Sequence, residues 1–371
     1  MVIGFCGGND VNERQITDLN IKGFKSIREA SIKFGMINVF IGANGAGKSN
    51  LISVFKLLQN LIDERLQIYV SQQGAPDALL HFGRKTTEAI EVRFTFGNNG
   101  YYFRLIPTLD NKLIFENESF YWNVRGDYSL GQGHLESKWK KGVNNHINEY
   151  IWPILKNQNW RVYHFHDTSE SALVKQYGNI NDNAFLAPDA RNLAAFLYRL
   201  NSVDLDCYTL IKDTIRLVAP FFDDFVLREN PFMNGMIQLE WKDVNDTSIF
   251  NASQMSDGTL RFICLATLLL QPEKLQPETI LLDEPELGLH PFAITVLAGM
   301  IKKAAYKKQI VLSTQSVELL NEFEPNDIVV VEHKGNNTQF TRQSEKKLRG
   351  WIEDDYSLGE IWKTNLIGGR P

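Results

Sequence analysis

The chain has 371 residues, of which 43% are hydrophobic, and a formal net charge of -5 at pH 7. This composition predicts one large or two modest folded domains and argues against wholesale disorder. The acidic balance argues against a protein that coats nucleic acid with its whole surface, but it leaves room for a local basic stripe. The three scattered cysteines, Cys6, Cys207 and Cys264, argue against a disulfide framework and fit a reducing cytoplasm. We expect no secretory signal in residues 1–12 and no membrane span, because no run reaches about 18 apolar residues.

The first third of the chain predicts a β-rich opening, followed by a glycine loop between a strand and a helix. Residues 16–34 read as short strands, and 36–41 form an apolar run of buried-strand length. Residues 50–62 carry leucine and valine at helical spacing. Alternating apolar and polar positions over 88–125 predict antiparallel strands, and polar residues over 126–150 predict an exposed loop.

The rest of the chain predicts a helical region and then alternating strands and helices. Expected strands cover 160–166, 236–241, 279–282, 309–313 and 327–332. Expected helices cover 192–200, 206–218, 260–270, 291–305 and 317–322. The alternation after residue 275 predicts a parallel sheet with helices packed on it.

A phosphate-binding loop follows the strand at 36–41. Its residues are Gly42, Ala43, Asn44, Gly45, Ala46, Gly47, Lys48 and Ser49. This pattern between a strand and a helix matches the P-loop, whose glycines let backbone N–H groups surround phosphate. We expect Lys48 to neutralise the β- and γ-phosphates of ATP and the Ser49 hydroxyl to bind Mg²⁺.

Two carboxylates end the apolar strand at 279–282, where ligands of α/β sheets bind. Asp283 is expected to hold Mg²⁺ together with Ser49. Glu284 is expected to orient and deprotonate the attacking water. Adjacent strand residues point to opposite sides, which suits two separate tasks.

A third motif, Ser256, Asp257 and Gly258, opens the apolar helix at 260–270. It resembles the signature loop of the ABC ATPase superfamily. That resemblance implies that these residues grip the γ-phosphate held by a second copy of the chain, so that ATP joins two heads. The alternative is an ordinary helix N-cap by Ser256 or Asp257.

Two positions depart from the pattern of that superfamily. His290 stands where transporters have an aspartate, and Gln315 occupies the switch position that is often histidine. Because the glutamine side chain cannot become protonated as histidine can, we expect slow hydrolysis. ATP is then expected to hold two chains together more than to supply energy through turnover.

The chain as a whole resembles the RecF/SMC/OLD-like branch, and within it a bacterial AAA21-like subgroup. The opening at 16–27, the runs MSDGTLRF, LLDEPELGLHP and LSTQS, and the segments YSLGEIW and GGRP carry this resemblance. The sequence contains no sustained heptad repeat, which argues against the long coiled coil of an SMC-type protein. After Gln315 only 56 residues (371 − 315) remain, which is too few for the Toprim nuclease of OLD-family proteins. The resemblance therefore implies a separate effector protein from the same operon, often in antiphage defence.

The expected fold is an α/β P-loop NTPase of the ABC-ATPase head type, with a mixed sheet core, an antiparallel β lobe and a helical signature lobe. Residues 1–125 and 275–371 are expected to form the core lobe, and 126–274 the helical lobe. The resemblance implies a cytoplasmic homodimer or higher even-numbered oligomer that acts as a sensor or scaffold in a defence or DNA-transaction complex. The alternatives are a RecF-like DNA repair clamp and a scaffold that cages a nuclease or toxin. A transporter motor is the least favoured reading.

Several residues keep two readings. His164 and His166 share one face of a predicted strand, where packing is favoured over a metal site. Gln72 or Gln73 is a candidate for the glutamine that links the lobes of ABC heads. Arg261 either contacts phosphate in trans or serves the chain's own structure. DNA remains a candidate partner.

Overall fold

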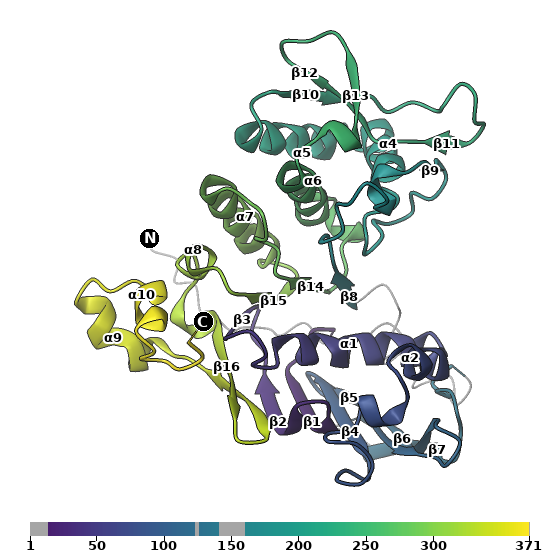
Figure 1. Ribbon diagram of the computed structural model, residues 1–371, viewed down its shortest axis with the longest axis vertical. Coiled ribbons are helices and arrows are strands. Elements are labelled where there is room, and N and C mark those ends of the chain that lie inside the picture. The colour runs from purple at the N-terminus through teal and green to yellow at the C-terminus, as the bar shows by residue number, and fades with distance from the viewer. Residues whose placement is uncertain (1–13, 123–125, 141–159, 371) are drawn as a thin grey trace, which may run out of the picture. The chain divides into compact units, whose positions relative to one another are not determined.

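The computed structural model describes residues 14–122, 126–140 and 160–370 (Figure 1). The chain forms two compact units. Unit 1 consists of Met1–Gly35, Lys56–Asn159 and Lys334–Gln339, and unit 2 of Met36–Phe55, Trp160–His333 and Phe340–Pro371. This division follows other boundaries than the predicted lobes 1–125 with 275–371 and 126–274, which stay a prediction.

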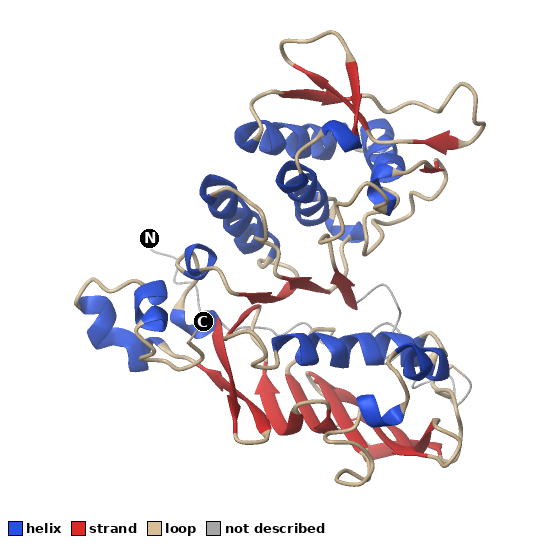
Figure 2. Ribbon diagram, in the orientation of Figure 1, coloured by secondary structure: helices blue, strands red, loops and turns tan. Residues whose placement is uncertain are grey.

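Unit 1 is built on an antiparallel sheet with the strand order β2-β1-β4-β5-β6-β7 (Figure 2). The strands are β1 (Asp18–Phe24), β2 (Ile27–Lys33), β4 (Ile90–Phe96), β5 (Asn99–Pro107), β6 (Leu113–Trp122) and β7 (Gly126–Gly131). In β4 every second residue is buried, as the sequence alternation requires for a sheet with one covered face. The antiparallel prediction for 88–125 is confirmed. The loop expected at 126–150 begins with β7, which pairs with β6, and residues 141–150 lie outside the described part.

Unit 1 contains the second part of one helix and all of the next. Helix α1 (Lys48–Ile62) begins in unit 2 and ends in unit 1, and α2 (Leu66–Gln72) follows it. The carboxylate of Glu136 accepts hydrogen bonds from the amides of Leu66 and Gln67, at 2.7 and 3.1 Å. It thus satisfies amides at the start of α2 that have no partner within the helix. The Trp139 indole donates to the carbonyl of Ile62 at 2.8 Å and caps the end of α1.

Unit 2 is built on a six-stranded sheet with the order β17-β16-β3-β15-β14-β8. The strands are β3 (Ile37–Ile41), β8 (Trp160–Tyr163), β14 (Thr279–Asp283), β15 (Gln309–Thr314), β16 (Ile328–Lys334) and β17 (Asn337–Arg342). From β16 to β8 neighbouring strands run parallel. This confirms the parallel sheet predicted from alternating strands and helices, and it aligns the carboxyl ends of β3, β14 and β15 at one edge.

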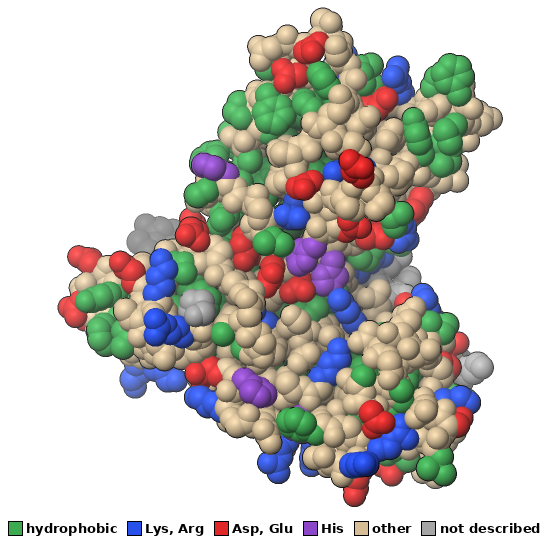
Figure 3. All heavy atoms as spheres, in the orientation of Figure 1, with side chains coloured by type: hydrophobic (Ala, Val, Ile, Leu, Met, Phe, Trp, Pro, Cys, Tyr) green, Lys and Arg blue, Asp and Glu red, His purple; other side chains and the backbone are tan. Residues whose placement is uncertain are grey.

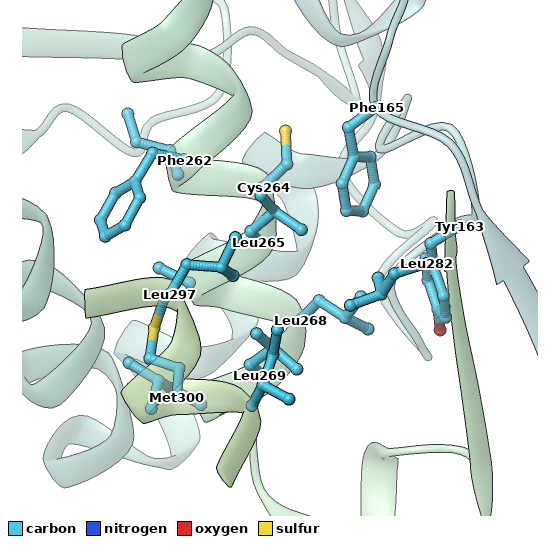
Figure 4. Close-up of a cluster of buried hydrophobic side chains, with 14 of the residues drawn as sticks. Tyr163, Phe165, Phe262, Cys264, Leu265, Leu268, Leu269, Leu282, Leu297 and Met300 are labelled. Carbon is cyan, nitrogen blue, oxygen red and sulfur yellow. The ribbon is translucent and has the colours of Figure 1, made fainter. Parts of the chain in front are cut away.

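The helices of unit 2 pack on one another and on this sheet. They are α4 (Leu193–Val203), α5 (Leu205–Val218), α6 (Asp257–Leu270), α7 (Pro291–Ala304), α8 (Val317–Leu320), α9 (Glu345–Glu353) and α10 (Leu358–Lys363). Helix α6 is buried along nearly its whole length, from Leu260 to Leu270. Figure 4 shows Leu265 and Leu268 of α6 between Leu297 of α7 and Leu282 of β14. This cluster packs the end of β14 against the middle of α6.

The strand expected at 236–241 is interrupted. Residues Met236–Ile237 form β11, which pairs with β9 (Gly178–Asn179), while Glu240–Asp243 form β12, which lies between β10 (Phe222–Phe225) and β13 (Ile249–Asn251). Four further elements, α2, β17, α9 and α10, were not predicted from the sequence. In the described part of the chain, no helix combines the length and apolarity needed to cross a bilayer.

Candidate nucleotide site

The phosphate-binding loop lies between the end of β3 at Ile41 and the start of α1 at Lys48. Gly45 and Gly47 have φ values of 78° and 112°, which glycine adopts without strain. A Cβ at Gly42 would lie 2.3 Å from the carbonyl oxygen of Val331, so this position has no room for a side chain. The predicted strand, loop and helix are therefore present in the expected order.

Lys48 lies across this loop. Its ammonium donates to the carbonyls of Gly42 at 2.5 Å and Ala43 at 3.2 Å, and only 6% of the residue is exposed. Burial lowers the pKa of Lys48, and the negative charges of Glu284, Asp283 and Glu286 oppose that shift. The lysine of the loop and the carboxylates after β14 therefore belong to one electrostatic site.

The two predicted acidic residues end β14 in different environments. Asp283 accepts a hydrogen bond of 2.5 Å from the Ser313 hydroxyl of β15. Glu284 has a φ of 42°, a backbone conformation that costs energy for a residue other than glycine. The amide of Glu284 donates to the carbonyl of Ser313 at 2.9 Å, which holds the residue there. Such strain concentrates at functional sites, where the surrounding structure enforces it.

Gln315 and Glu284 are in direct contact. The side-chain amide nitrogen of Gln315 (Nε2) donates to a carboxylate oxygen of Glu284. The structure thus brings together the predicted switch residue and the predicted general base, and it orients the carboxylate. The catalytic roles of both residues stay predictions.

Glu286, for which no role was predicted from the sequence, is 9% exposed, and its charge acts on the pKa of Lys48. One carboxylate oxygen accepts from the Thr314 hydroxyl at 2.5 Å and from the backbone N–H of Gln315 at 3.2 Å. Its other oxygen is buried without a hydrogen-bond partner among the described residues. Burial raises the pKa of Glu286. The only sequence signal was a third acid two positions after Glu284.

Two histidines follow β8 and face the end of β14. His166 donates from Nε2 to the Asp283 carbonyl at 2.7 Å, and Nδ1 of His164 lies 3.7 Å from a carboxylate oxygen of Asp283. Figure 3 shows histidine and acidic side chains together over this edge of the sheet. Within the described ranges, no group of three or more His, Cys, Asp or Glu side chains is arranged to hold a metal. His166 thus contacts the backbone of Asp283, and His164 lies near its carboxylate.

Comparison with protein families decides the class of this site. Residues 37–321, more than half of the chain, match the family model described as "AAA domain, putative AbiEii toxin, Type IV TA system". The chain belongs to this family. The matched range includes the phosphate-binding loop, the acids after β14 and Gln315.

Two known proteins are similar to the chain. An "ATP/GTP phosphatase" of Helicobacter pylori is 22% identical over 74% of this chain and 77% of its own length. A protein of Mycoplasma genitalium, provisionally named as an ABC transporter ATP-binding protein, is 26% identical over 45% of this chain. The chain spans only half of the length of that second relative.

A solved structure confirms the fold. The crystal structure of an SMC head bound to the C-terminal winged-helix domain of ScpA superposes with a TM-score of 0.61, at 17% identity. The superposition covers 90% of this chain and 99% of the SMC head. The predicted P-loop fold of the ABC-head type is therefore confirmed.

In this AAA-family chain the signature-loop residues open α6. The Ser256 hydroxyl accepts from the Thr259 amide at 3.2 Å, so Ser256 is the N-cap of the helix. Asp257 lies 3.4 Å from the ammonium of Lys175. Ser256 and Asp257 are exposed, whereas a Cβ at Gly258 would lie 2.5 Å from the carbonyl of Gly288. The structure shows the N-cap by Ser256, and the role of Ser256, Asp257 and Gly258 in trans stays a prediction.

Arg261 serves the chain's own structure. It is 6% exposed, and its guanidinium donates to the carbonyls of Phe165 at 2.9 Å, His166 at 3.2 Å and Leu287. These bonds tie α6 to the residues after β8 and after β14. For Arg261 the structure therefore favours a structural role over contact with phosphate in trans. His290, the other unusual position, caps α7 by accepting from the Phe292 amide at 3.3 Å.

Ser49 and Asp283 are the candidate Mg²⁺ ligands. Ser49 is exposed at the start of α1, and the Asp283 side chain is 17% exposed. A hydroxyl and one carboxylate, completed by phosphate oxygens and water, suit a cation that keeps part of its hydration shell. The donor set therefore fits Mg²⁺ at this edge of the sheet.

Proposed function

We propose that this chain binds ATP with Mg²⁺ at Gly42–Ser49 and Asp283 and hydrolyses it between two copies of the chain. Within each site Lys48 binds the β- and γ-phosphates, and Glu284, oriented by Gln315, accepts a proton from the attacking water. The observation that carries this proposal is the buried ammonium of Lys48, which bonds the carbonyls of Gly42 and Ala43 within the glycine loop between β3 and α1. The charges of Asp283, Glu284 and Glu286 act on the pKa of this ammonium.

In the proposed mechanism the exposed start of α6 completes the site of the second chain. The hydroxyl of Ser256 and the first amides of α6 present hydrogen-bond donors and a positive dipole end to the γ-phosphate. Asp257 is neutralised in part by Lys175, so its charge repels phosphate less. Hydrolysis removes the γ-phosphate, and the two chains separate.

The resulting cycle suits a sensor or scaffold in a multi-protein complex for antiphage defence or DNA transactions. The description of the family, with its toxin and type IV toxin–antitoxin system, supports a defence role. The SMC head bound to a domain of ScpA supports a head that docks a separate protein. We propose the effector as such a partner, with DNA as a second candidate.

The test compares Lys48→Ala and Glu284→Gln in the purified chain, using ATP binding and phosphate release. Lys48→Ala is expected to weaken ATP binding at least about 30-fold, because it removes a buried charged donor. Glu284→Gln is expected to keep binding and to slow hydrolysis by about 100- to 10,000-fold, because only the base is lost.

Lys303→Ala on α7 is the matched control, because it removes an exposed lysine far along the chain from the loop. It is expected to behave as the wild-type chain. Wild-type hydrolysis rates in both site variants would mean that the site is misassigned. Stimulation of hydrolysis by bare DNA without any protein partner would favour a RecF-like clamp instead.

A further inference from the structure

A cavity of about 410 Å³ lies beside the phosphate-binding loop in unit 2. Three segments line it: the loop at Ala43–Ala46, the end of β16 at Val331–His333, and the residues Asn365, Gly369 and Arg370. Its volume falls within the range of about 300–1,000 Å³ that is usual for small-molecule sites. None of the catalytic roles assigned above uses this cavity.

The strand order gives the direction in which a bound nucleotide runs. Strand β3, which leads into the loop, has β15 on one side and β16 on the other. Asp283, Glu284 and Gln315 follow β14 and β15, so the γ-phosphate belongs on that side. The other end of the triphosphate, which carries ribose and base, then leaves the loop on the side of β16, where the cavity lies.

The charge at the cavity favours a nucleoside over another phosphate. Glu332 contributes a carboxylate to the lining, and its Oε1 accepts from the Gly369 amide at 3.1 Å. A carboxylate repels phosphate but accepts hydrogen bonds from ribose hydroxyls. Arg370 and His333 add a planar guanidinium and an imidazole, both of which can stack on a base.

The wall that carries Arg370 is firmly held. Trp362 is fully buried, and its indole donates to the Gly369 carbonyl at 2.7 Å. Gly369 has a φ of 64°, and a Cβ there would lie 2.7 Å from the Val330 side chain and 3.5 Å from the Cα of Gly42. Only glycine therefore lets residues 368–370 pass this close to the phosphate-binding loop, which places Arg370 at the rim of the cavity.

We propose that this cavity holds the ribose and purine base of the bound nucleotide, with the guanidinium of Arg370 stacked on the base. The inference rests on the proposed ATP binding and adds the part of the ligand that Gly42–Ser49 does not reach. Stacking recognises the ring face and not its edge groups. ATP and GTP are therefore expected to bind with similar affinity.

The test measures affinities of ATP and inorganic tripolyphosphate for Arg370→Ala by calorimetry, with hydrogen exchange on the wild-type chain as a second readout. Arg370→Ala is expected to weaken ATP binding by roughly 3- to 30-fold, the usual range for a lost cation–π contact, and to leave tripolyphosphate unaffected. ATP is expected to protect the amides of 331–333 and 365–370, and tripolyphosphate is not. Arg349→Ala on α9, an exposed arginine of the same unit, is the control and is expected to bind ATP normally.

An unchanged ATP affinity in Arg370→Ala, an equal loss for ATP and tripolyphosphate, or ATP binding without protection at 331–333 and 365–370 would each overturn this inference. These results leave the proposed function standing, because they concern only the nucleoside end. A wild-type chain that binds neither ATP nor tripolyphosphate would instead remove the proposed function itself.

Discussion

Glu286 is a buried acid with only one of its two carboxylate oxygens hydrogen-bonded within the described part of the chain. Burial raises the pKa of Glu286, so the folded chain holds its proton more readily than the unfolded chain does. The stability that this proton adds is fully present below the ordinary glutamate pKa and is lost as the pH rises through the raised value. Above the raised pKa of Glu286 the folded chain therefore bears a buried carboxylate.

Glu286→Gln tests this at the scale of one residue. The amide oxygen still accepts from Thr314, and no charge is buried, so we expect the variant to be about 1 kcal/mol more stable than the wild-type chain at a pH above the raised pKa of Glu286. The gain is expected to shrink as the pH falls and the wild-type residue takes up its proton. Urea unfolding at several pH values measures the difference. A gain that does not change with pH, or that Glu353→Gln on the exposed face of α9 reproduces, would contradict the prediction.

At the scale of elements, the start of α6 is fitted against the segment after β14. A Cβ at Gly258 would lie 2.5 Å from the carbonyl oxygen of Gly288, a backbone atom that moves only with its whole turn. The same segment is held by Arg261 through the carbonyl of Leu287. A change at Gly258 therefore disturbs both the predicted signature loop and the turn that follows the carboxylates at the end of β14.

We expect Gly258→Ala to destabilise the chain by about 1–3 kcal/mol, the usual effect of overpacking, and to reduce ATP hydrolysis. Gly299→Ala is the matched control. Gly299 is exposed within α7, and a methyl group there would meet no atom of the described residues within 4 Å, so this variant is expected to gain about 0.5–1 kcal/mol. Thermal unfolding and phosphate release measure both. Equal behaviour of the two variants would show that the contact with Gly288 does not constrain α6.

Elements and motifs differed in how well the sequence predicted them. The chain from β3 to α1 and from β14 to β16 was predicted because buried strands and amphipathic helices leave clear periods, and because glycine, lysine and acid positions are tied to phosphate chemistry. Strand β7 was missed because its polar residues form an edge strand with one buried position, Leu130. The interruption between β11 and β12 was missed because an apolar run does not show which partner each half pairs with.

The supporting residues of the site could not be predicted for a related reason. Glu286, His166 and Arg261 act on carbonyls and hydroxyls of segments distant in the chain. Sequence spacing says nothing of such contacts until the parallel sheet has aligned the strand ends. The closeness of Gly369 to the phosphate-binding loop depends in the same way on the burial of Trp362.

At the scale of the whole molecule, the proposal of a two-chain site makes a prediction that a one-chain site cannot. Lys48→Ala disables the loop of its own chain, whereas Ser256→Glu disables only what a chain offers to its partner. Ser256 is exposed, and a carboxylate at the start of α6 is compatible with the helix dipole but repels the γ-phosphate. Each variant alone is therefore expected to fold and to be inactive.

Mixing the two variants is expected to restore hydrolysis. In a mixed pair, one site combines the intact loop of the Ser256→Glu chain with the intact Ser256 of the Lys48→Ala chain, while the other site is defective on both sides. Random pairing makes about half of the pairs mixed, each with one of two sites intact, so recovery is expected to approach about a quarter of the wild-type rate. Phosphate release from an equimolar mixture, followed over increasing protein concentration, measures it. If the mixture stays as inactive as its components at every concentration, each chain works with its own residues, and Ser256, Asp257 and Gly258 have no role in trans.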